Sequence, residues 1–186
     1  QRLLLYPATL PDTVREWFEN ARILAIEDVP LESHVEGIPY SGASACEEVA
    51  SEWVALLKNR SALQLPEGAC RWRILLDLED YVCADVILCL SGGEGSRVSI
   101  TFAESLFEDD TFTTKGHRDR FGGKYFRGIG DTYIASGREG HFFKSMHWRS
   151  GRYVQILVEK GKSPLRIDSL RLVKRGYPLE QACRFD

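Results

Sequence analysis

The sequence predicts a mainly β domain, an antiparallel jelly-roll-like β-sandwich with one helix in its first half. From residue 62 onward, eight segments alternate apolar and polar residues, as half-buried strands do. Turn residues separate these segments at short intervals, and only residues 44–59 show clear helical periodicity. Many short strands with few helices are typical of a sandwich.

The first 43 residues are predicted to be an irregular N-terminal segment or linker, and residues 44–186 to be the sandwich module. Within the first part, residues 3–6 fit an edge strand, residues 22–29 fit a strand, and residues 30–42 show no regular pattern. Between the two strands we expect a short helix capped by Asp12 or Thr13, with an apolar side made of Val14, Trp17, Phe18 and Ala21.

The helix at residues 44–59 is the clearest single element. Ser44 and Glu47 form a capping-box pattern at its start. One apolar stripe follows at helical spacing: Val49, Ala50, Trp53, Leu56 and Leu57. We expect this stripe to pack against the sheet.

The strands are expected at residues 62–65, 71–78, 82–90, 98–106, 131–135, 141–148, 153–159 and 165–173. A glycine-rich turn at residues 91–96 joins the third strand to the fourth. Residues 108–130 form a long polar connection. Gly128–Asp131 has a GxGD pattern, but it precedes a strand, so it is not a phosphate-binding loop.

Two of these strands place a charged residue where the alternation predicts a core position. Glu104 continues the face formed by Val98, Ile100 and Phe102, and Arg152 begins the face formed by Val154, Ile156 and Val158. An unpaired buried charge is too costly, whereas a hydrogen-bonded pair is tolerable. Our hypothesis is that Glu104 pairs with Arg152 across the sheet edge. The equally weighted alternative is that both strand ends fray into water.

Composition excludes several classes of function. The chain has 186 residues, 44% of them hydrophobic, and a net charge of −3 with both signs interspersed. No basic stripe indicates a nucleic-acid partner, and no apolar run approaches the ~20 residues of a membrane span. The first residues, interrupted by Pro7 and Pro11, do not resemble a signal peptide. Because the chain lacks an initial Met and stops at Asp186, we expect it to be a piece of a longer protein.

Neither the cysteines nor the histidines indicate a metal centre. The five cysteines, Cys46, Cys70, Cys83, Cys89 and Cys183, are odd in number and contain no CxxC. They favour reduced thiols and therefore a reducing compartment. Export of the protein from the cell is the alternative. The histidines His34, His117, His141 and His147 lack ligand spacing. No metal or cofactor is expected; Ca²⁺ bound by the acidic residues 108–110 is a minor alternative.

Several ordered motifs carry a family resemblance: ITFAESLF, KGHRDRFGGKYFRGIGDTYIASG, HWRSGRYVQILV and DSLRLVKRGYPLEQACRFD. From about residue 62 to the C-terminus the chain resembles the β-sandwich module before the catalytic domain of bacterial α-L-rhamnosidases, glycoside hydrolase family 78. It departs from the family pattern twice. His117 replaces the usual Asn, and Gly151 replaces an aromatic residue, which leaves either a hole or a close backbone approach.

The resemblance implies a parent enzyme that hydrolyses terminal L-rhamnose from glycans or glycosides. In the family the catalytic acids lie in an (α/α)₆ barrel after this module, so no catalytic residue is expected here. The expected partner is that C-terminal catalytic domain, which would face the surface near Trp148, Tyr177 and Pro178. The location, cytoplasmic or periplasmic in a bacterium, is undetermined. An independent module binding rhamnose-containing sugar, and a purely structural spacer, are the alternatives.

Sugar sites combine a flat aromatic with a few polar groups, which nominates Trp148 with His147 and Arg149, and Tyr125 with Arg127. The preferred alternative for Trp148 is a packed tryptophan in the core or at a domain interface. If Trp148 and Tyr125 are exposed together in a groove, a sugar-binding role is favoured. If they are buried and separate, a purely structural role is favoured. Arg118 and Asp119 are expected to form a loop-fixing ion pair that involves Asp131.

Overall fold

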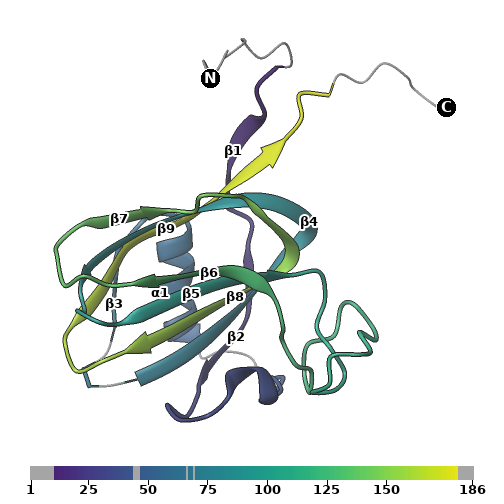
Figure 1. Ribbon diagram of the computed structural model, residues 1–186, viewed down its shortest axis with the longest axis horizontal. Coiled ribbons are helices and arrows are strands. Elements are labelled where there is room, and N and C mark those ends of the chain that lie inside the picture. The colour runs from purple at the N-terminus through teal and green to yellow at the C-terminus, as the bar shows by residue number, and fades with distance from the viewer. Residues whose placement is uncertain (1–10, 44–46, 66, 69, 180–186) are drawn as a thin grey trace, which may run out of the picture.

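The computed structural model describes residues 11–43, 47–65, 67–68 and 70–179. Its strands are all paired antiparallel and curl into two facing layers, which confirms the predicted β-sandwich (Figure 1). The strands are β1 (Val14–Phe18), β2 (Arg22–Asp28), β3 (Leu63–Gln64), β4 (Cys70–Gly92), β5 (Arg97–Ala103), β6 (Ile129–Ile134), β7 (His141–Lys144), β8 (Arg149–Lys160) and β9 (Leu165–Gly176). The described helices are α1 (Glu47–Leu57) and the short 3₁₀ helix η1 (Val35–Gly37).

Strand β4 belongs to both layers. Its first part pairs with β2 and β8, and its second part pairs with β9 and β7. Between them the register with β8 shifts from Asp77 to Val82, and Glu79 adopts a positive φ of 63°. Such a bulge bends a strand and increases its twist. The expected separation into strands 71–78 and 82–90 is therefore wrong, because the charged residues Glu79 and Asp80 bend one continuous strand instead of ending it.

The main core lies between the two layers. The predicted inward faces are buried on β5 (Val98, Ile100, Phe102), on β8 (Val154, Ile156, Val158) and on the second part of β4 (Val82, Ala84, Val86, Leu88, Leu90). Burying such branched and aromatic side chains contributes roughly 1.5–3 kcal/mol each. The alternation in the sequence therefore predicted the core correctly.

A second, smaller core lies beneath the long connection between β5 and β6. It contains Ala25, Tyr40, Leu75, Ala103, Leu106, Phe126 and Tyr153. Tyr40 donates a hydrogen bond to Gln155 Oε1 at 2.8 Å, and Tyr153 donates one to the carbonyl of Arg118 at 2.5 Å. The bond from Tyr153 holds the connection against β8, and backbone hydrogen bonds between Tyr40 and residues 123–124 join it to the segment after β2.

The N-terminal part differs most from the expectation. Val14–Phe18 is strand β1, not a helix, and β2 pairs with β4 within the sandwich. Strand β2 confirms the strand expected at residues 22–29, whereas the short helix expected before it is wrong. The edge strand expected at residues 3–6 lies outside the described residues. Strand β1 and the last part of β9 extend together away from the other strands (Figure 1).

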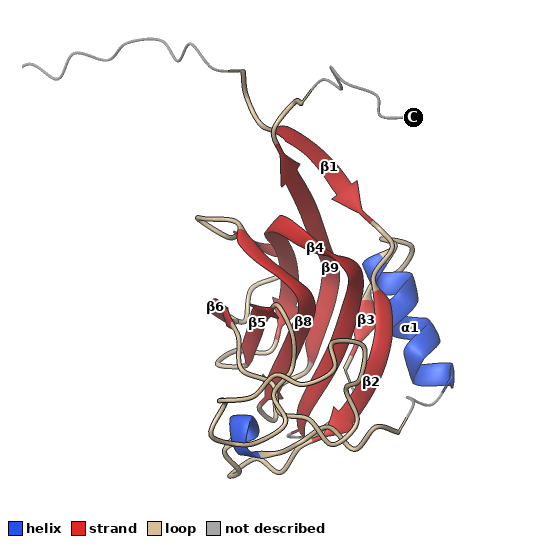
Figure 2. Ribbon diagram, turned by 90° about the vertical axis from the view of Figure 1, so that its right-hand side faces the viewer, coloured by secondary structure: helices blue, strands red, loops and turns tan. Residues whose placement is uncertain are grey.

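Helix α1 lies beside β2, β3 and β9 at one side of the sheets (Figure 2). Trp53 and Leu56 of the predicted stripe are fully buried, and Val49 and Leu57 pack against the same core. The packing role predicted for this helix is confirmed, whereas Ser44 of the capping box lies outside the described residues. Within the described ranges, no helix is both long and apolar enough to cross a membrane.

Candidate functional site

An open groove of about 610 Å³ lies where the connection after β5 meets the start of β6. Its volume falls within the range of roughly 300–1,000 Å³ that is usual for ligand pockets. The lining comes from residues 102–105 with Phe107, from residues 127–129, and from Glu36, Tyr81, Lys115 and Ser150. Six stretches that are separate in the sequence therefore meet at this surface.

One side of the groove is apolar and aromatic. Tyr81 is 54% exposed, and Ile129, another lining residue, is also largely exposed. Phe107 packs edge-on against Phe112, with ring centroids 5.4 Å apart. The groove thus offers flat apolar surface to a ligand while part of its aromatic wall is held by packing.

Cationic groups lie over these aromatic rings. The guanidinium of Arg127 sits 4.9 Å from the Phe112 centroid, and Lys115 Nζ sits 6.0 Å from the Phe107 centroid. Cation–π contacts of this kind restrict the position of a long side chain. Arg127 is exposed, so its N–H donors remain available at the groove.

Glu104 supplies an ionised carboxylate. Lys115 Nζ donates to its Oε2 at 2.8 Å, and Arg118 Nη2 donates to its Oε1 at 3.1 Å. The hydrogen bond from Lys115, reinforced by Arg118, holds the pKa of Glu104 below its ordinary value. A general acid needs the opposite shift, so Glu104 can accept hydrogen bonds but is unsuited to donate a catalytic proton.

Ser105 adds a buried hydroxyl. This residue is only 5% exposed, lines the groove, and its Oγ has no hydrogen-bond partner among the described residues. A buried polar group without a partner costs about 1–3 kcal/mol. The Oγ atom is itself shielded from solvent, so a ligand in the groove does not reach it in this conformation.

Of the five predicted sugar-binding residues, only Arg127 lines this groove. Trp148 is 52% exposed, so it is not a core tryptophan, and His147 beside it is also exposed. Arg149 Nη2 instead donates to Asp131 Oδ1 at 2.9 Å. Tyr125 is half-buried and pairs through its backbone with Phe107. Trp148 and Tyr125 therefore do not lie together in the groove. They are also not both buried, so the structure shows neither the shared groove nor the two separate buried side chains that were considered.

The predicted ion pairs have the wrong partners. Arg152 binds Asp77 and Asp119, not Glu104, because β5 ends at Ala103 and Asp77 lies beside β8 in the sheet. Arg118 binds Glu104, and Asp131 binds Arg149. Each of these charges is paired, but the pairs cross between elements that sequence spacing cannot relate.

Sequence reasoning did not find Tyr81, Ser105 or Phe107. Tyr81 follows the bend in β4, and the other two follow β5, so only the fold brings them together. The Gly128–Asp131 motif overlaps the strand it was expected to precede, since β6 begins at Ile129, but it opens no helix, as predicted. Over the described part of the chain, no three His, Cys, Asp or Glu side chains are grouped as a metal site would require.

No family model matches this chain, and none of the curated proteins matches it. Among solved structures, it is similar to a glycoside hydrolase family 78 rhamnosidase of Bacillus sp. GL1, with 16% identity, a TM-score of 0.49, and coverage of 74% of this chain and 13% of the other. A rhamnosidase from Klebsiella oxytoca with rhamnose bound has 10% identity, a TM-score of 0.45, and coverage of 88% and 30%.

CpGH89CBM32-6, produced by Clostridium perfringens, has 9% identity, a TM-score of 0.41, and coverage of 81% of this chain and 92% of the other. The chain spans only a minor part of either rhamnosidase. No TM-score among these three reaches 0.5, so none of these likenesses assigns a function to this chain.

Proposed function

We propose that this chain is a non-catalytic β-sandwich domain that contacts carbohydrate through the groove, as the accessory domain of an α-L-rhamnosidase-like glycoside hydrolase. The groove carries the proposal, because it places exposed aromatic and apolar surface beside the donors of Arg127 and the carboxylate of Glu104. Recognition sites typically combine an apolar wall with a few placed polar groups, which suits the C–H faces and hydroxyls of a sugar.

The role proposed for the groove is binding, not hydrolysis. Glycosidases of the usual kind need two carboxyl groups, one of them held protonated as the general acid. The carboxyl groups in the lining are those of Glu36 and Glu104, and the pKa of Glu104 is lowered. In this proposal, hydrolysis belongs to the catalytic domain of the parent protein.

The motif resemblance supports rhamnose as the sugar. A docking face for the catalytic domain is supported by exposed apolar side chains on the extension formed by β1 and β9: Val14, Tyr177 and Leu179. A two-stranded ribbon is only marginally stable alone, so packing against a neighbour would stabilise it. This docking is part of the proposal.

An independent carbohydrate-binding module is the second candidate, favoured by the exposed aromatic side chain of Tyr81 in the groove lining. Affinity separates the two candidates. A micromolar dissociation constant for the isolated chain favours the independent module. A millimolar constant favours an accessory domain that shares its ligand with the catalytic site.

Calorimetric titration with L-rhamnose and with a rhamnoside tests the proposal. We expect saturable binding that Arg127→Ala weakens about tenfold, because one charged hydrogen-bond donor is lost. Trp148→Ala, which removes an exposed aromatic outside the groove, should bind as the unmodified chain does. A chromogenic rhamnoside should not be turned over. Turnover by this chain would contradict the non-catalytic role, and equal binding by Arg127→Ala would contradict the groove.

A further inference from the structure

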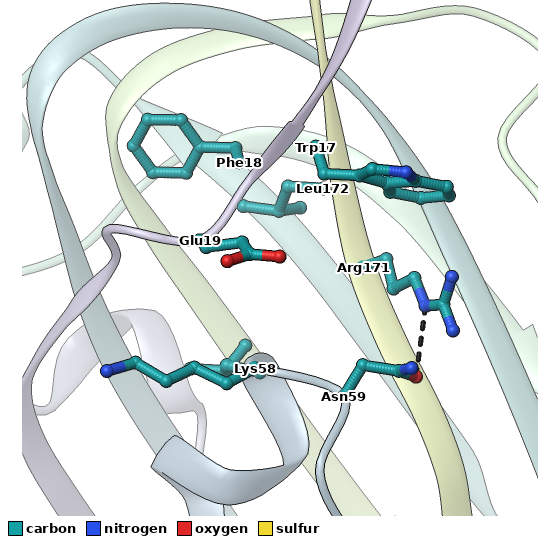
Figure 3. A pocket seen from close by; sticks show the side chains of 8 residues that line it. Trp17, Phe18, Glu19, Lys58, Asn59, Arg171 and Leu172 are labelled. Carbon is teal, nitrogen blue, oxygen red and sulfur yellow. Dashed lines mark hydrogen bonds between the residues drawn. The ribbon is translucent and has the colours of Figure 1, made fainter.

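A second, smaller recess lies at the junction of β1, β9 and the end of α1 (Figure 3). Its volume is about 180 Å³, below the roughly 300–1,000 Å³ of most ligand pockets. It therefore suits a single ring rather than a chain. Phe18, Leu57 and Leu172 supply its apolar part.

An aromatic and a guanidinium form one wall. Trp17 is 56% exposed, and the guanidinium of Arg171 lies 4.9 Å from the Trp17 ring centroid. Arg171 Nε donates to Asn59 Oδ1 at 3.0 Å (Figure 3). These two contacts hold the guanidinium in place. Its Nη1 and Nη2 atoms donate to none of the residues that line this recess.

The backbone conformation of Asn59 also helps to position this wall. Asn59 follows α1 and adopts a positive φ of 53°, which Asn tolerates better than most residues. Its amide nitrogen remains a donor while its oxygen accepts from Arg171. The carboxylate of Glu19 lies in the recess across from these donors, so hydrogen-bond donors and an acceptor face a common space (Figure 3).

We propose that this recess is a second ligand site, which binds one neutral sugar ring. Arg171 and Asn59 would donate to ring hydroxyls, Glu19 would accept from them, and Phe18, Leu57 and Leu172 would contact an apolar C–H face. Trp17 would report the ligand through the guanidinium of Arg171 that covers its ring. The lining carries two cationic side chains, Lys58 and Arg171, and one carboxylate, Glu19, so an anionic sugar is the comparison that separates charge attraction from hydroxyl recognition. That the ligand is a sugar rests on the proposed carbohydrate role, whereas the recess itself does not.

The experiment uses Trp17 as its own reporter. Of the four tryptophans, Trp53 is fully buried and Trp148 is the other strongly exposed one, so Trp148→Phe leaves Trp17 as the main solvent-exposed fluorophore. This variant is titrated with L-rhamnose, D-galactose and D-glucose, with D-glucuronate as the anionic comparison. We expect a saturable fluorescence change with a neutral sugar.

Asn59→Gly is the decisive variant, because glycine accepts the positive φ and only the amide is lost. It should weaken the fluorescence response about tenfold, while Arg127→Ala in the groove should leave the response unchanged. A response only to D-glucuronate, no response at all, or an equal response in Asn59→Gly would overturn the second site. If calorimetry shows binding that depends on Arg127 while Trp17 fluorescence does not change, the groove site stands and only the recess site is refuted. The failure of one proposal can therefore be told from the failure of the other.

Discussion

Asp77 is a buried carboxylate that joins three strands through two arginines. Arg152 donates to it through Nε and Nη2 at 2.8 and 2.9 Å, and Arg22 donates through Nη2 at 3.1 Å. Its side chain is 1% exposed. Burial alone would raise the pKa of Asp77, but the hydrogen bonds from Arg152 and from the Glu79 N–H outweigh it, so the pKa lies below its ordinary value.

Asp77→Asn should destabilise the fold by about 3 kcal/mol, because Arg152 would lose its buried counter-ion. Urea unfolding at neutral pH measures this free energy. Asp131→Asn is the matched control. Its partner Arg149 is half-buried and the Asp131 side chain is 32% exposed, so the loss should stay near 1 kcal/mol or less. Equal losses in the two variants would contradict the special role of Asp77.

The ion pair between Asp77 and Arg152 also predicts that the free energy of unfolding depends on pH. Because the folded pKa of Asp77 is depressed, the unfolded state binds more protons at acid pH, and this contribution to stability rises with pH there. The contribution is complete above the unfolded pKa of about 3.9 and is lost as pH falls through the folded value. The stability difference between the unmodified chain and Asp77→Asn should therefore shrink below about pH 4. A difference that stays constant down to pH 2 would refute the linkage.

At the scale of elements, β8 approaches β5 unusually closely at Gly151. A Cβ added there would lie 2.7 Å from the carbonyl oxygen of Ala103 and 2.8 Å from its nitrogen. The two outcomes expected from the missing aromatic residue were a hole and a backbone approach; the structure has the backbone approach. Backbone atoms cannot rotate away from a new methyl group as a side chain can.

Gly151→Ala should therefore lower the free energy of unfolding by about 1–3 kcal/mol, as overpacking does. Thermal unfolding followed by circular dichroism measures the change. Gly161→Ala serves as the control, since no atom lies within 4 Å of its added Cβ. That control should be neutral or stabilise by up to about 1 kcal/mol. If Gly151→Ala were as stable as the control, the close approach would be wrong.

The elements that the sequence predicted well are those whose burial follows from local alternation. The paired faces of β5 and β8 are examples, since every second residue must enter the core. Strand β1 was mistaken for a helix because Val14, Trp17 and Phe18 also fit a helical spacing. The segment forms a strand because it pairs with β9, more than 150 residues away in the sequence. A local sequence pattern contains no information about such a distant partner.

At the scale of the whole molecule, the groove forms only when distant segments meet. Arg127 was nominated from sequence because it lies next to aromatic residues in the long connection. Tyr81 was not, because the bend in β4 that exposes it resembles an ordinary charged turn. The lowered pKa of Glu104 depends on Lys115 and Arg118, whose positions follow from the folded connection.

The central claim is that carbohydrate binds in this groove. Nuclear magnetic resonance of the ¹⁵N-labelled chain, titrated with a rhamnoside, tests it most directly. Backbone amide shifts should cluster at residues 102–107, at residues 127–129 and at Ser150, and they should saturate together. The absence of shifts at these residues would contradict binding in the groove, whereas a separate cluster at Trp17, Asn59 and Arg171 would belong to the second recess.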